Sequence, residues 1–175
     1  MTVRILALIL SIQLLYGCGN RIGNNTALPD STSNASEGAA NPVKDNVEEL
    51  GMLVRLPFEV EVEEAVWKEE PMRIPGTEQN ASANQKKLTA VLRFSSENGR
   101  KVAGQVEKVK AGEPAILGTE RWFPAELIAQ SELNGADNLK GMSYAAADFY
   151  LPPYSEGRIT QVENTDYFVL ELFAK

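Results

Sequence analysis

The chain has 175 residues, a net charge of −7, no histidine and a single cysteine. This length suits one folded domain, and the acidic balance opposes binding to a phosphate backbone, so we expect no nucleic-acid partner. Cys/His metal sites, histidine-dependent catalysis and an intrachain disulfide are all excluded. Because the sequence also has no phosphate loop, nucleophile elbow or dinucleotide fingerprint, it predicts no catalytic residue, metal or cofactor.

The first eighteen residues have the three-part layout of a secretory signal. Residues 1–4 carry one positive charge, residues 5–15 are almost wholly apolar, and a small glycine precedes the cysteine. The apolar run is well short of the ~20 residues that a membrane-spanning helix needs. The last four of the eighteen residues, Leu15-Tyr16-Gly17-Cys18, resemble the lipobox of bacterial lipoproteins, in which an obligatory cysteine follows a small residue.

This resemblance implies that residues 1–17 are removed and that Cys18 receives diacylglycerol and palmitate as the new N-terminus. Acyl chains contribute about 0.8 kcal/mol per buried methylene, so two of them hold a protein firmly to a bilayer. The expected location is the cell envelope, after export through the secretory pathway. Gly19 is not the aspartate that commonly retains such proteins at the inner membrane, so the outer membrane is favoured where a cell has two. The alternatives are an ordinary cleaved signal followed by a buried free cysteine, or a plain N-terminal helix.

The segment after the cysteine has the composition of a flexible tether. Residues 19–46 are dominated by Asn, Ser, Gly, Ala and Thr. Such a segment cannot bury enough apolar surface to offset the entropy lost on ordering. We therefore predict a lipidated cysteine and disordered linker over residues 18–46, and a single domain over residues 47–175.

The clearest strand pattern in this domain covers residues 52–62, where every second residue is apolar. A period of two predicts a half-buried strand, with Glu59, Glu61 and Glu63 in a row on its outer face. Three carboxylates could gather Ca²⁺, but residues on one face of a strand do not converge on one ion, so a solvated face is favoured. Pro57 lacks an N–H, which predicts a sheet edge or a bulge there.

Two helices are predicted further along the chain. The first follows an N-cap at Ser95 or Ser96, carries Val102, Val106 and Val109 on one stripe, and ends before Gly112. The second begins at Pro124, turns Phe123, Leu127 and Ile128 inward, and ends at 134–135. After a polar loop at 77–87, strands are predicted over 88–94, 115–119, 143–149, 158–163 and 167–173, the last two joined as a hairpin.

This order of elements predicts an α+β domain. We expect an antiparallel or mixed sheet of about five to six strands, with one or two helices packed on one face, behind the flexible tether.

The most unusual stretch is Phe149-Tyr150-Leu151-Pro152-Pro153-Tyr154. Aromatic faces in a surface loop could stack on sugar rings or grip a peptide. The alternative is that the prolines stiffen a connection while the aromatic rings cap the core. The candidate binding surface comprises Tyr150, Pro152, Pro153, Tyr154, Trp67 and Trp122.

The function expected from the sequence is a membrane-anchored lipoprotein that presents a small acidic domain for non-catalytic binding or assembly with another envelope component. Its partners would be the bilayer, through acylated Cys18, and an envelope protein or glycan. The alternatives are a glycan- or peptidoglycan-binding module that uses the surface aromatics, or a carboxylate-based envelope hydrolase.

Overall fold

A computed structural model describes residues 42–56, 59–72, 85–133, 135 and 137–175. All of them belong to one compact unit, Glu37–Lys175. The signal segment, Cys18 and most of the expected linker lie outside the described residues. So do Pro57 and residues 77–84 of the expected polar loop.

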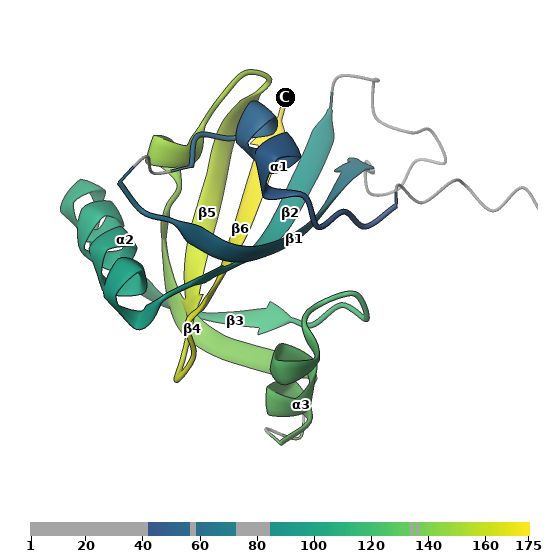
Figure 1. The fold of residues 1–175 in the computed structure, drawn as a ribbon, viewed down its shortest axis with the longest axis vertical. Coiled ribbons are helices and arrows are strands. Elements are labelled where there is room, and N and C mark those ends of the chain that lie inside the picture. Colours follow the sequence, from purple (N-terminus) through teal and green to yellow (C-terminus); the bar gives the residue numbers. More distant parts are fainter. Residues whose placement is uncertain (1–41, 57–58, 73–84, 134, 136) are drawn as a thin grey trace, which may run out of the picture. The chain divides into compact units, whose positions relative to one another are not determined.

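Six strands form one antiparallel sheet in the order β1-β2-β6-β5-β4-β3 (Figure 1). The strands are β1 (Val62–Pro71), β2 (Lys86–Phe94), β3 (Glu113–Gly118), β4 (Asn138–Ala145), β5 (Tyr154–Val162) and β6 (Tyr167–Ala174). The helices are α1 (Val47–Leu53), α2 (Ser96–Val109), α3 (Ala125–Leu133) and the short 3-10 helix η1 (Ala147–Phe149). The predicted α+β class and antiparallel sheet are confirmed.

The central strands β2 and β6 are buried on both faces. Alternate residues such as Leu92 and Phe168 enter one apolar cluster with Leu50 of α1 and Val102 of α2. The residues between them, such as Val91 and Val169, join a second cluster with Leu127 of α3. Helices α1 and α2 therefore cover one face of the sheet, and α3 packs on the opposite face.

The expected strand over residues 52–62 is wrong, because its first two residues belong to α1, which ends at Leu53, and β1 begins only at Val62. The Asn46 side chain caps α1 by accepting hydrogen bonds from the backbone N–H groups of Glu48 (2.8 Å) and Glu49 (3.1 Å). Leu50 and Val54, four residues apart, are both fully buried, which fits a helical stripe. Glu59 and Glu61 lie in the connection to β1, so the predicted row of carboxylates does not form.

Helix α2 begins as predicted. Ser95 is its N-cap and accepts a hydrogen bond from the N–H of Asn98 at 3.2 Å. Val102 and Val106 are buried, whereas Val109 is exposed, so the buried stripe is one turn shorter than expected. Gly99 lies against the Phe168 ring, which lets the helix approach β6 closely.

The remaining predicted elements agree in type with the structure but differ at their ends. The hairpin of β5 and β6 turns through residues 163–166, as predicted, with Asn164 at a positive φ of 59°. The strand expected over 143–149 is instead the second half of β4 followed by η1. The expected linker also ends too late, because Lys44 already pairs with Trp67 of β1 and Asn46 caps α1.

Candidate functional site

The aromatic and proline loop largely contributes to the core. Phe149 is buried, and Tyr154 is 3% exposed, with its hydroxyl donating to Glu69 at 2.6 Å. Tyr150 is half-buried and donates to the carbonyl of Gly157 at 3.4 Å. Pro152 and Pro153 are exposed and joined by a cis peptide bond. This arrangement is the predicted alternative, in which prolines form the connection and aromatic rings cap the core.

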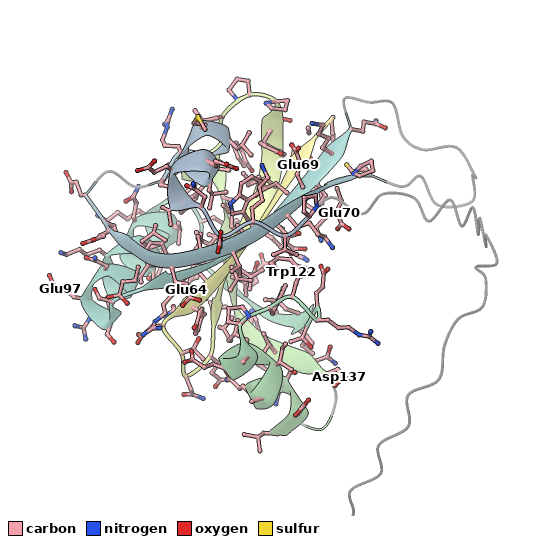
Figure 2. All side chains as sticks on the ribbon, turned by 45° about the vertical axis from the view of Figure 1, so that its right-hand side comes forward. Glu64, Glu69, Glu70, Glu97, Trp122 and Asp137 are labelled. Carbon is pink, nitrogen blue, oxygen red and sulfur yellow. The ribbon has the colours of Figure 1, made fainter. Side chains whose placement is uncertain are left out.

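Trp67 and Trp122 lie in different apolar clusters on the two faces of the sheet. Trp67 is 2% exposed and donates through Nε1 to the carbonyl of Asn46 at 3.2 Å. Trp122 is half-buried against the second cluster, and its Nε1 donates to Glu120 at 2.6 Å. Lys68 binds Glu120 as well, at 3.1 Å, so β1 is tied to the loop before α3 near Trp122 (Figure 2).

The predicted binding residues therefore do not form one exposed surface. Trp67, Tyr150 and Tyr154 belong to or pack against the cluster beneath α1 and α2, whereas Trp122 packs on the other face. In the part of the chain that the structure describes, no aromatic side chain is exposed. A sugar ring would find no pair of free aromatic faces among these residues.

A different surface stands out at the outer edge of β3. This strand is the last in the sheet and pairs only with β4 among the described segments. The N–H of Thr119 donates to the carbonyl of Asp137 at 3.1 Å, in register with the ladder. Because hydrogen-bonded and non-bonded pairs alternate in an antiparallel ladder, the backbone groups of Pro114, Ile116 and Gly118 point away from β4.

Beside this edge, the sheet carries a shallow groove of about 580 Å³. We call it the β3 groove, and the residues that line it include Pro114, Ile116, Lys140, Met142, Gln161 and Glu163. Ile116 is 70% exposed and Met142 is 37% exposed. The β3 groove thus places apolar side chains directly next to unpaired backbone donors and acceptors.

Gly141 allows the sheet to form this groove. A methyl group on Gly141 would lie 2.9 Å from Cγ2 of Thr160 and even closer to the carbonyl oxygen of Gln161. Only a residue without a side chain lets β4 come this close to β5. The position of β3, which is carried by β4, depends on this contact.

The opposite edge of the sheet is protected. Strand β1 has the sequence VEEAVWKEEP, in which half of the residues are charged. Lys44 also pairs with the outer side of β1, through two backbone hydrogen bonds of 2.8 Å with Trp67. Charges and covering segments are the usual means of keeping a sheet edge from pairing with another chain. Strand β3, with the sequence EPAILG, has one charged residue and no such cover among the described residues.

Two ionisable side chains with shifted pKa values, Glu171 and Tyr167, belong to β6 and do not line the β3 groove. Burial would raise the pKa of Glu171, but hydrogen bonds from Arg158 and Lys87 outweigh it and hold this pKa below its ordinary value. Burial, with a hydrogen bond donated to Glu126 at 2.6 Å, raises the pKa of Tyr167 to about 12. Among the described residues, no group of three or more acidic or cysteine side chains is placed to hold a metal ion.

Comparisons with protein-family models, with curated proteins and with solved structures find no match for this chain. The described helices include none with the length and apolar character needed to cross a bilayer. Sequence reasoning missed Pro114, Ile116 and Met142. Its one usable signal was a short apolar strand with a proline and a single charge, since proline in a strand favours an edge.

Proposed function

We propose that this chain is a lipid-anchored protein of the cell envelope whose domain serves in non-catalytic assembly with another envelope component. The anchor rests on the resemblance of Leu15-Tyr16-Gly17-Cys18 to a lipobox. The assembly role rests on the β3 groove, where exposed Ile116 adjoins unpaired backbone groups. An apolar groove beside a free strand edge suits the addition of a strand from another chain.

Two further observations support this role over that of a passive spacer. The two edges of the sheet differ: β1 has several charged residues and a pairing segment, whereas β3 has a single charged residue, Glu113, and no pairing segment among the described residues. The β3 groove is also formed mainly by the paired strands β3, β4 and β5, with Glu163 and Asn164 added from the β5–β6 turn, so ladder hydrogen bonds support its shape without a partner.

The anchor is tested by metabolic labelling with palmitate in a bacterium. The wild-type chain should incorporate the label and sediment with membranes, and Cys18→Ser should lose both properties. A Gly19→Asp variant should keep the label but move from the outer to the inner membrane in a host that has two. Membrane sedimentation of Cys18→Ser equal to that of the wild type would contradict the proposed anchor.

The assembly role is tested separately on membranes dissolved in mild detergent. In native electrophoresis, the wild-type chain should migrate as a complex larger than a monomer. Ile116→Lys should release it, because a charge at a strand edge opposes pairing. Leu133→Lys is the matched control, because Leu133 is 88% exposed on α3 and does not line the β3 groove. Equal migration of the wild type and Ile116→Lys would refute assembly through this edge.

A further inference from the structure

Met142 is the sulfur-bearing side chain of the β3 groove. It lies in β4 opposite Pro114 of β3 and Gln161 of β5, and all three residues line the groove. Its Cγ atom is only 2.6 Å from the place where a side chain on Gly112 would begin, so the absence of that side chain leaves the space that the methionine occupies. Met142 is also 37% exposed, which makes it accessible to a small solute in water.

Few sulfur atoms of this chain are available to an oxidant. The sequence has one cysteine and four methionines. Under the proposed anchor the sulfur of Cys18 is acylated, so it has no thiolate from which oxidation begins. Among the described residues the methionines are Met52, Met72 and Met142, and Met142 alone lines the β3 groove. Outside the reducing cytosol, an oxidant would therefore act on thioether groups, one of which lies in the groove.

We propose that Met142 is a modification site, at which a hydroperoxide oxidises the thioether to a sulfoxide and thereby blocks assembly through the β3 groove. This inference rests on the proposed function and adds the regulation of the same site. In the reaction, a lone pair of the sulfur attacks one oxygen of the hydroperoxide, an S–O bond forms and the O–O bond breaks. Sulfur loses two electrons and the peroxide gains them. With hydrogen peroxide, the second oxygen takes the proton of the first and leaves as water.

The sulfoxide replaces an apolar contact by a polar one. A thioether is flexible and apolar, whereas the sulfoxide carries an oxygen that accepts hydrogen bonds. On the side of β3, the side chains of Pro114 and Ile116 have no donor for this oxygen. Turned towards Lys140 or Gln161, the oxygen finds a donor, but the side chain then presents a polar group to the groove. In both positions, a partner in the groove loses apolar surface that Met142 offers before oxidation.

The same geometry predicts that assembly protects Met142. A partner that occupies the groove covers this side chain and excludes the oxidant from it. Met52 provides the comparison, because it is 74% exposed on α1 and does not line the β3 groove. Its oxidation should proceed at the same rate with and without the partner.

The first test treats membranes that contain the lipidated full-length chain with a dilution series of hydrogen peroxide. Native electrophoresis in mild detergent measures the complex, and mass spectrometry measures the sulfoxide at each methionine. Association should weaken about tenfold or more once Met142 is oxidised, the effect of one poorly paired polar group in an apolar contact. Methionine sulfoxide reductases A and B together should restore the complex, because each reduces one epimer. A complex that persists with Met142 fully oxidised would overturn the proposal.

Two leucine variants identify the residue responsible. Met142→Leu keeps the groove apolar at similar volume but has no sulfur, so its complex should form and survive the peroxide. Met52→Leu is the matched control and should stay as sensitive as the wild type. Equal sensitivity of Met142→Leu and the wild type would overturn Met142 as the site. A wild-type chain that already migrates as a monomer before any peroxide is added would refute the assembly role itself, and this inference with it.

The protection is tested with Ile116→Lys, which should release the partner. The sulfoxide at Met142 should then form several times faster than in the wild type, while the rate at Met52 stays the same. Equal rates at Met142 in a wild type that does form the complex would show that the partner leaves this side chain uncovered, which would also overturn the proposal.

Discussion

The substitution Gly141→Ala should destabilise the domain strongly, because β4 lies closely against its neighbour β5 at this residue. The added methyl group would lie 2.9 Å from Cγ2 of Thr160 and closer still to the carbonyl oxygen of Gln161, against an ordinary contact of about 3.5–4.0 Å. Relieving the contact requires β5 to move by about 1 Å. Overpacking typically costs about 1–3 kcal/mol, and we expect the upper end because the obstacle is backbone within the ladder.

The assay is urea unfolding of the full-length chain, followed by circular dichroism. With a slope of about 1.5 kcal/mol per molar urea, a loss of about 3 kcal/mol lowers the midpoint by about 2 M. Gly118→Ala is the matched control in a neighbouring strand, because nothing lies within 4 Å of the added carbon. Its effect should stay within about 0.5 kcal/mol. An unchanged midpoint for Gly141→Ala would refute the close approach of β4 to β5.

Two predictions concern the pH dependence of stability. The pKa of Glu171 is lowered on folding, so its contribution is present above the unfolded pKa and is lost as the pH falls through the folded one. Glu171→Gln should therefore lose less stability than the wild type between neutral and acid pH, as measured by urea midpoints. Equally steep losses in the two proteins would contradict this role of Glu171. The pKa of Tyr167 is raised from 10 to about 12, so its contribution is complete below pH ~10 and is lost as the pH rises towards 12. Tyr167→Phe should flatten the alkaline part of the same profile, and an unaltered profile would mean that this hydroxyl does not carry the effect.

Local signals predicted most of the elements that the structure contains. Ser95 was recognisable as an N-cap because its side chain satisfies a free N–H at the start of α2, a purely local interaction. The hairpin of β5 and β6 was also predictable from local sequence, because polar turn residues separate two apolar strands that pair with each other. Pro124 lies directly before α3, where its missing N–H costs nothing.

The segment around α1 shows where the local pattern failed. Residues 52–62 alternate between apolar and polar, but Leu50 and Val54 are also spaced as on a helix, and Asn46 with two following glutamates forms a helix start. The helix formed because it buries both Leu50 and Val54 in the main apolar cluster. The alternation was coincidental, because Met52 is exposed and Val60 belongs to the connection.

The candidate site could be predicted only in part. A short strand near 115–119 was expected, but the one local signal for a sheet edge, Pro114, lies just outside that range and did not enter the prediction. The place of this strand at the edge follows from the order of the whole sheet, in which β6 pairs with β2, far before it in the chain. The aromatic residues attracted attention for their chemistry, yet large apolar rings gain most from burial, and Trp67 and Tyr154 are buried accordingly.

The pairing of Lys44 with Trp67 has a mechanical consequence. A pull on the chain before residue 42 reaches the described part of the domain first at Lys44, where two backbone hydrogen bonds and the lysine over the Trp67 ring carry the load. Trp67 also donates to the carbonyl of Asn46, and the fully buried Leu50 and Val54 hold the segment that follows, so a pull meets these contacts before it reaches the β1–β2 ladder. Tension from that side would therefore load the core contacts of this segment before it loads the strands of the sheet.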